Sequence, residues 1–98
     1  MSMRFEHAQN VVDELPEEFY SHDFIEKYID LYEREYLAEL IRYALITPQR
    51  GAFKKLHSHM GLFLTRNMEK LHIRKDERGN TKNIKGNSTE NQKWIKTP

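Results

Sequence analysis

Residues 53–68, with the sequence FKKLHSHMGLFLTRNM, decide the fold that we expect for this chain. Apolar side chains recur in this stretch at the spacing of an amphipathic helix, at Phe53, Leu56, Met60, Phe63 and Leu64. The opposite arc of the helix is cationic and rich in hydrogen-bond donors, with Lys54, Lys55, Ser58, His59, Thr65 and Arg66. One face therefore requires a hydrophobic core, and the other either contacts a nucleic acid or is a solvated surface.

Two further apolar patterns precede this helix. Ser21 is a good N-cap residue, and residues 24–32 that follow it have apolar side chains at helical spacing. A second stripe occupies residues 36–44, and the pattern shifts between the two stripes at residues 33–35. We expect two helices joined by a tight turn rather than one helix of about 35 Å. The proline and glycine in residues 47–51, TPQRG, then separate these helices from the next one.

The chain after residue 68 has the alternation of β-structure. Apolar and polar residues alternate over residues 71–74, and residues 76–80, DERGN, have the composition of a turn. Residues 81–85 then form the expected returning strand, residues 86–88 a second turn, and residues 92–96, which include the only tryptophan, a last strand or docking segment. Because this part contains few apolar residues, a flexible basic segment is the alternative.

The first twenty residues are an N-terminal extension or a short helix. The apolar residues from Phe5 to Leu15 have roughly helical spacing, and Pro16 ends the pattern because proline lacks an N–H donor. We therefore place the main domain at residues 21–96. The expected fold class is α+β, with a core of three helices, or four if the extension is helical, and a C-terminal β-hairpin.

Length and composition narrow the class of protein. A chain of 98 residues forms one domain at most, and 38% of the residues are hydrophobic while 32% are charged. There is no cysteine, which excludes disulfides and thiolate metal sites and fits a cytoplasmic location. No apolar run approaches the roughly 18 residues of a membrane span, so we expect no membrane partner.

Charge is distributed unevenly along the chain. Residues 1–40 contain eleven Asp and Glu against three Lys and Arg, a net charge of −8, whereas residues 41–98 contain four against thirteen, a net charge of +9. Such an asymmetry suggests an anionic partner for the basic half, most simply a nucleic acid. The alternative is internal compensation, in which the acidic half neutralises the basic half through salt bridges across the fold.

This order of elements resembles the winged helix-turn-helix class of DNA-binding proteins, over roughly residues 21–96. The resemblance rests on helices followed by a basic helix and a basic hairpin, and no signature motif accompanies it. It implies that the third helix contacts duplex DNA through Lys54, Lys55, Ser58, His59, Thr65 and Arg66. It also implies that the hairpin acts as a wing through Arg74, Lys75, Arg78, Lys82 and Lys85. The expected function is a small DNA-binding protein, such as a transcriptional regulator.

An interaction module or accessory subunit is the alternative function. The five tyrosines lie in or directly after the acidic half, within residues 20–43, and their side chains either fill the core or form the interface of a homodimer or of a complex with another protein. We expect no cofactor and no catalytic residue, since the chain lacks a phosphate-binding glycine loop and a nucleophile motif. We also expect no metal ligands, because the histidines lack a chelating spacing such as H-x₃-H.

Overall fold

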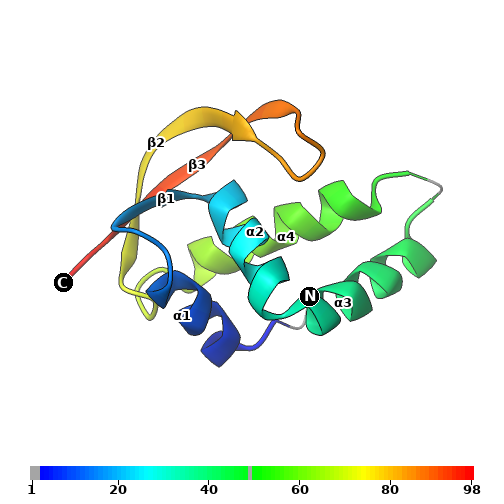
Figure 1. Cartoon of the computed structure of the whole chain (residues 1–98), viewed down its shortest axis with the longest axis horizontal. Coiled ribbons are helices and arrows are strands. Elements are labelled where there is room, and N and C mark those ends of the chain that lie inside the picture. Colours follow the sequence, from blue (N-terminus) through cyan, green and yellow to red (C-terminus); the bar gives the residue numbers. More distant parts are fainter. Residues whose placement is uncertain (1–2, 49) are drawn as a thin grey trace.

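The computed structural model describes residues 3–48 and 50–98, and it confirms the α+β class. Over these residues, four helices and a three-stranded antiparallel sheet follow one another along the chain (Figure 1). The elements are α1 (Phe5–Asp13), β1 (Glu18–Tyr20), α2 (Ser21–Leu31), α3 (Glu33–Ile46), α4 (Ala52–Arg66), β2 (Ile73–Lys82) and β3 (Ser88–Lys96).

The sheet has the strand order β1-β3-β2, so the last strand of the chain is the central one. The short strand β1 pairs with β3 through Phe19 opposite Trp94, and β2 pairs with the same strand through Lys75 opposite Trp94. The long β2–β3 hairpin lies along one edge of the molecule, while α1 and α3 lie along the opposite edge (Figure 1). Helices α2 and α4 occupy the space between these edges.

The hydrophobic core joins every helix to the sheet. Trp94 of β3 is only 1% exposed, and its indole Nε1 donates a hydrogen bond to Ser21 Oγ over 2.9 Å. Of the five apolar side chains that the helical spacing predicts for the core face of α4, Leu56, Met60 and Leu64 are buried. Phe63 is partly buried against the core, whereas Phe53 is exposed. The remaining large, fully buried side chains are Phe19, Phe24, Leu71, Val11 and Val12.

The N-terminal residues take part in the same core as the rest of the chain. Residues 5–13 form α1, the short helix that we considered for this segment, and Ala8, Val11 and Val12 on it are buried. Leu15 and Phe19, which flank Pro16, also belong to the core cluster. The elements α1 and β1 precede the main domain expected from the sequence, and both contribute core side chains to it.

Helices α2 and α3 are separate, as we expected from the shifted apolar pattern, and do not form one long helix. The break is at Tyr32, whose backbone has φ −133° and ψ 49°. Helical backbone hydrogen bonds nevertheless continue on both sides of the break, because Tyr32 N donates to Tyr28 O and Tyr36 N donates to Tyr32 O. The start of α2 differs from the expectation by one residue, because Tyr20 rather than Ser21 is the N-cap, and Asp23 Oδ2 accepts a hydrogen bond from Tyr20 N over 2.8 Å.

The boundaries of α4 agree with the prediction of a helix over residues 53–68 to within two residues. Gly51 precedes the helix with φ +100°, a left-handed conformation that glycine adopts without strain. Asn67 ends it with φ −116° and ψ 14°. Its Nδ2 donates to the carbonyl oxygen of Phe63 over 2.9 Å, and the same oxygen accepts a hydrogen bond from Asn67 N over 3.0 Å.

The hairpin is longer than expected, and its turn overlaps the second expected turn, residues 86–88, rather than the first. Residues 76–80 are not a turn and residues 81–85 are not the returning strand, because β2 continues to Lys82 with an irregularity between Lys75 and Arg78. The chain reverses at residues 83–87, where Asn83 Oδ1 accepts hydrogen bonds from two backbone N–H groups of the turn. The prediction was wrong because β2 is exposed over most of its length, so its polar residues have the composition of a turn.

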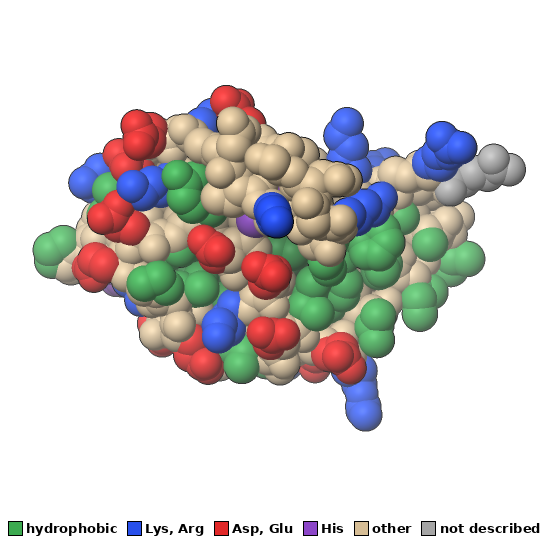
Figure 2. Space-filling model, turned by 45° about the horizontal axis from the view of Figure 1, so that its top comes forward, with side chains coloured by type: hydrophobic (Ala, Val, Ile, Leu, Met, Phe, Trp, Pro, Cys, Tyr) green, Lys and Arg blue, Asp and Glu red, His purple; other side chains and the backbone are tan. Residues whose placement is uncertain are grey.

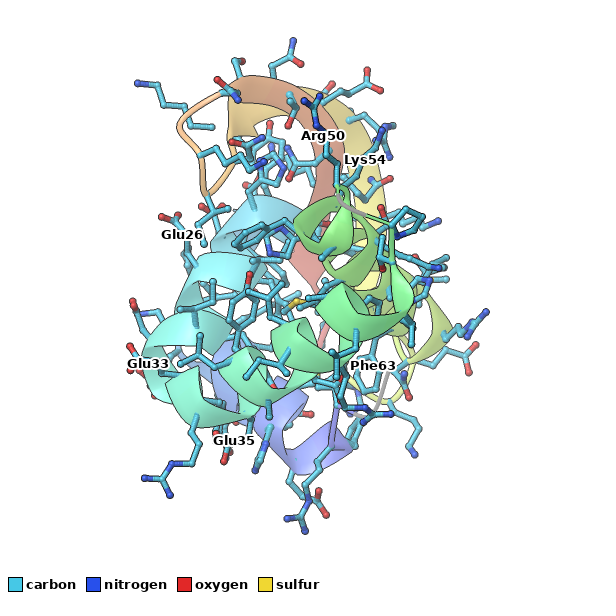
Figure 3. All side chains as sticks on the ribbon, turned by 90° about the vertical axis from the view of Figure 1, so that its right-hand side faces the viewer. Glu26, Glu33, Glu35, Arg50, Lys54 and Phe63 are labelled. Atoms are coloured by element: carbon cyan, nitrogen blue, oxygen red, sulfur yellow. The ribbon has the colours of Figure 1, made fainter. Side chains whose placement is uncertain are left out.

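The acidic and basic residues that are separated along the sequence are also separated in space. Figure 3 shows Glu26, Glu33 and Glu35 on α2 and α3 at a distance from Arg50 and Lys54, which lie near the start of α4. In Figure 2, Lys and Arg side chains project on the side where α4 begins, next to a group of hydrophobic side chains. The basic half of the chain therefore presents a cationic surface around α4 and the hairpin.

Replacement of the central tryptophan tests this core. We expect Trp94→Ala to lower the free energy of unfolding by about 3–5 kcal/mol, since it removes a fully buried indole. Ile84→Ala, in the exposed hairpin turn, is the control and should change this free energy by less than about 0.5 kcal/mol. Urea unfolding followed by far-ultraviolet circular dichroism measures both. Equal costs for the two variants would show that Trp94 is not the centre of the core.

Candidate nucleic-acid interface

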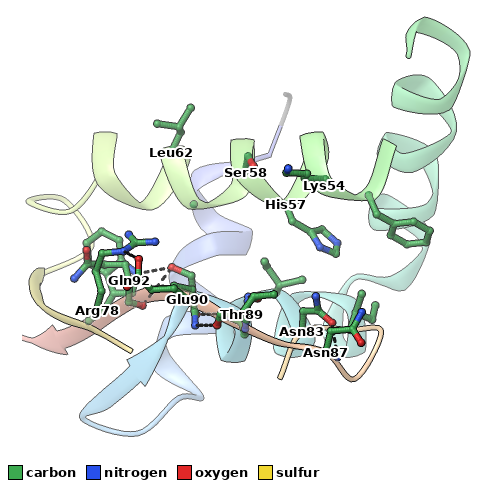
Figure 4. A pocket seen from close by; sticks show the side chains of 18 of the residues that line it. Lys54, His57, Ser58, Leu62, Arg78, Asn83, Asn87, Thr89, Glu90 and Gln92 are labelled. Atoms are coloured by element: carbon green, nitrogen blue, oxygen red, sulfur yellow. Dashed lines mark hydrogen bonds and ion pairs between the residues drawn. The ribbon is translucent and has the colours of Figure 1, made fainter. Parts of the chain in front are cut away.

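A cleft of about 840 Å³ lies between α4 and the β2–β3 hairpin, and we call it the α4–hairpin cleft. Figure 4 shows the helix on one bank and the hairpin on the other, with His57 projecting from α4 into the space between them. The start of α2 contributes to its floor through Ser21, His22 and Ile25. Three segments far apart in the sequence therefore form one concave surface.

Six of the residues predicted from the sequence line this cleft. Lys54, Ser58 and Thr65 lie on the α4 bank, and Lys75, Arg78 and Lys85 on the hairpin bank. The other five predicted residues are not among its lining residues: Lys55, His59, Arg66, Arg74 and Lys82. The helix and the hairpin thus bring about half of the predicted set together.

His59 faces a different neighbour from the rest of the polar arc. Its Nδ1 lies 2.5 Å from the hydroxyl of Tyr43 on α3, and the two rings meet edge to face with centroids 5.4 Å apart. The side chain therefore contributes to the contact between α3 and α4. A helical wheel places His59 beside Arg66 in the polar arc, but it does not show that α3 covers that edge of the arc.

His57 is a cleft residue that the prediction of binding residues did not include. Its Nε2 forms a 2.7 Å hydrogen bond with the hydroxyl of Tyr36, and the ring of Phe53 packs edge to face against it. Burial lowers the pKa of His57 from its ordinary 6.5 to about 4, and the nearby charges of His22 and Lys85 act in the same direction. Burial also raises the pKa of Tyr36 to about 12. At neutral pH both members of this pair are therefore uncharged.

A hydrogen-bonded group of polar side chains connects the floor of the cleft to the hairpin. Asn91 is 7% exposed, and its Oδ1 accepts a hydrogen bond from the backbone N–H of His22 over 2.9 Å. Its Nδ2 donates to Thr81 Oγ1 over 2.8 Å, and this hydroxyl is also 2.7 Å from His22 Nδ1. The amide of Asn91 thus joins the N-terminus of α2 to both strands of the hairpin, which no sequence motif indicated.

The charges around the cleft are mostly positive. Arg78 Nε forms a 3.0 Å ion pair with Glu90 Oε1, which offsets part of its charge. Lys54 and Lys75 are exposed, and Lys85 Nζ lies 5.6 Å from the centre of the Phe53 ring across the cleft. The cleft therefore has a cationic rim, with exposed amides on the hairpin side. Three exposed apolar side chains, Phe53, Leu62 and Ile84, also line it.

No family model, no curated protein and no solved structure matches this chain. Among residues 3–48 and 50–98, no three His, Asp or Glu side chains lie close enough together to hold a metal ion. Within the same described residues, no helix is long and apolar enough to cross a membrane. The geometry and charge of the cleft are therefore the features of this chain that bear on its function.

The lowered pKa of His57 predicts a pH dependence of stability. Between pH 6.5 and 4 the unfolded chain takes up a proton at this histidine and the folded chain does not, so the free energy of unfolding falls as the pH decreases through this window. We expect a loss on the order of 1–2 kcal/mol, because the ring is only partly buried and solvent screens the effect. Urea unfolding at a series of pH values measures it.

His57→Gln is the matched variant for this measurement, because glutamine is polar but does not titrate. The dependence on pH between 6.5 and 5 should be clearly flatter in the variant than in the original protein. Carboxylates titrate mainly below this range and affect both proteins alike. The same slope in both proteins would mean that His57 is not the group whose protonation opposes folding.

Proposed function

We propose that this chain is a small DNA-binding protein that holds the nucleic acid at the α4–hairpin cleft. The observation that carries the proposal is the convergence of cations from separate segments, Lys54 from α4 with Lys75, Arg78 and Lys85 from the hairpin, on one concave surface. Phosphate groups supply most of the sequence-independent affinity of DNA-binding proteins, and lysine and arginine are their usual partners.

The two banks have different roles in this proposal. The hairpin is the wing, and its cations and amides bind the sugar–phosphate backbone, with Asn83, Asn87 and Gln92 as uncharged hydrogen-bonding groups. Helix α4 contributes Lys54 and Ser58 from its first half. The role is one of binding rather than catalysis, and we assign it to a regulator of transcription in the cytoplasm.

The resemblance to the winged helix-turn-helix class supports the same function, since α4 precedes the hairpin as the third helix precedes the wing. The cleft changes which residues we expect to matter most. In the class-based expectation, Lys55 and Arg66 contact DNA as strongly as Lys54 does. In the cleft-based proposal these two exposed residues lie outside the main contact and contribute only through long-range attraction.

Charge reversal on the two banks tests the proposal. We expect Lys54→Glu and Lys85→Glu each to weaken binding to a random-sequence DNA duplex by about tenfold at low salt, and to reduce the dependence on salt by about one phosphate contact. Fluorescence anisotropy with a labelled duplex, repeated from about 50 to 200 mM salt, measures both quantities. A labelled single strand of the same sequence shows whether the duplex is preferred.

Lys70→Glu is the matched control, because it makes the same change of charge on an exposed lysine that packs over Phe5 and does not line the cleft. We expect its affinity to stay within about twofold of the original, as for a charge screened by salt over a long distance. Lys55→Glu should give an intermediate loss. Absence of binding to any nucleic acid at low salt, or equal losses in Lys54→Glu and Lys70→Glu, would refute the proposal.

A further inference from the structure

One side of α4 lines the cleft with an aromatic ring, an imidazole and a glycine. Phe53, His57 and Gly61 follow one another at a spacing of four residues, so they lie side by side along the helix, and all three line the α4–hairpin cleft. His57 projects into the space between helix and hairpin in Figure 4. Behind its cationic rim, the wall of the cleft that α4 forms is therefore uncharged at neutral pH along this side.

Phe53 has its aromatic ring in the cleft and not in the core. The helical spacing predicts it to be buried, but it is 38% exposed. Its ring meets that of His57 at 69° with the centroids 5.9 Å apart, and Lys85 Nζ lies 5.6 Å from its centre. Proteins that bind single nucleic-acid strands combine such parts, because a base stacks on an exposed aromatic ring while a nearby cation binds its phosphate.

Gly61 lies in the interior of α4, where the fold does not require a glycine. Glycine in a helix interior lowers stability relative to alanine, and the φ angle of Gly61 is not in the left-handed region. Outside its own helix, no described atom would lie within 4 Å of a Cβ at this position. What the missing side chain provides is room in the cleft, since a ligand can approach the backbone closely at a glycine.

The hairpin limits what can reach this wall of the cleft. A DNA major groove is about 12 Å wide, and one helix with its side chains, about 10–12 Å across, fills it. The hairpin forms the other bank of the cleft and approaches α4 where Lys85 lies near Phe53, so this side of the helix cannot enter a major groove with the hairpin in place. A duplex therefore contacts only the rim, whereas an unpaired strand is thin enough to pass between the banks.

The charges of the rim suit the phosphates of such a strand. Lys54 and Arg78 lie at separate points along the cleft (Figure 4), and Lys85 lies beside the ring of Phe53. Among the described residues that line the cleft, Glu90 is the only acidic one, and it pairs with Arg78 over 3.0 Å. The cleft therefore has an excess of positive charge, as a strand with one negative charge per nucleotide requires.

We propose that the α4–hairpin cleft takes an unpaired DNA strand, with one base stacked on Phe53 and the next nucleotide lying over Gly61. Lys85 binds the phosphate of the stacked nucleotide, and Lys54 and Arg78 bind phosphates farther along the strand. This inference rests on the DNA binding proposed above and names the form of DNA that enters the cleft. Duplex DNA binds through the rim cations alone, so it lacks the contribution of stacking.

Three labelled DNA probes separate the contribution of the bases from that of the phosphates. They are an oligothymidylate of about ten nucleotides, an abasic strand with the same number of phosphates, and a duplex of the same length. We expect the full chain to bind oligothymidylate about tenfold more tightly than the abasic strand, and more tightly than the duplex, because stacking adds to the electrostatic attraction. Fluorescence anisotropy at low salt measures the three affinities.

Phe53→Ala tests the stacking. We expect it to weaken the binding of oligothymidylate about tenfold and to leave the abasic strand and the duplex within about twofold of the original affinity. Phe53→Trp retains a stacking surface and should bind oligothymidylate at least as well as the original protein. Leu62→Ala is the control, because Leu62 is an exposed apolar residue of the cleft without an aromatic ring. Equal losses for oligothymidylate and the abasic strand in Phe53→Ala would overturn the inference.

Gly61→Leu tests the room in the cleft without a loss of folding, because leucine favours a helix more than glycine does. We expect the larger side chain to weaken oligothymidylate binding about tenfold, while the duplex, which stays at the rim, changes by less than about twofold. Gly61→Ala is the control, since it improves the helix in the same way but adds only a methyl group. If Gly61→Leu binds oligothymidylate as well as Gly61→Ala does, the strand does not lie over this position.

The possible failures of this experiment differ from one another. Binding of the abasic strand as tightly as oligothymidylate would leave the DNA-binding function standing and would overturn the stacked strand. Tighter binding of the duplex than of oligothymidylate would do the same. Binding of none of the three probes would refute the proposed function and the inference with it. Displacement of labelled oligothymidylate by polyglutamate at the same concentration of charge would assign the cleft to an acidic protein segment and would also overturn the inference.

Discussion

The indole of Trp94 is the group on which the rest of the structure depends. It is large, almost completely buried, and carries an N–H that would be costly to leave without an acceptor, by about 1–3 kcal/mol. Ser21 supplies that acceptor from the first turn of α2. Because β1 ends at the residue before Ser21 and pairs with β3 beside Trp94, one side chain fixes α2, β1 and β3 relative to one another.

The cleft is a consequence of this arrangement. The hairpin is anchored near Trp94 and again at Asn91, whose amide binds the start of α2, and from there it extends past the edge of the sheet that β1 covers. Its turn approaches the beginning of α4, where Lys85 lies over the ring of Phe53. Between these contacts the helix and the hairpin diverge, and both polar and apolar side chains line the space between them.

The helices could be predicted from the sequence because their apolar residues repeat at a regular spacing and face one core. Leu56, Met60 and Leu64 are buried as that spacing requires, and the shift of pattern at residues 33–35 marked the break next to Tyr32. The hairpin turn could not be predicted in the same way. Strand β2 is solvated over most of its length, and the turn depends on Asn83, whose side chain binds the backbone of its own turn.

The candidate site could be predicted only in part, because charge and helical spacing describe a single helix and not its neighbours. Charge and helical spacing indicate that α4 has a cationic arc, but they do not show which neighbour covers each edge of it, so His59 was assigned to the binding surface although it contacts Tyr43. No sequence pattern indicates the role of Asn91, because a buried asparagine in a polar segment has the same local sequence as an exposed one. Tertiary packing alone distinguishes these cases.

The two tyrosine–histidine pairs between α3 and α4 also restrict how these helices can slide. Tyr36 meets His57 and Tyr43 meets His59, and both bonds are partly shielded from water. Displacement of either helix by one turn would separate all four polar groups from their partners, whereas Leu40 and its apolar neighbours would find similar contacts. The apolar side chains hold the helices together, and the polar pairs permit only one alignment between them.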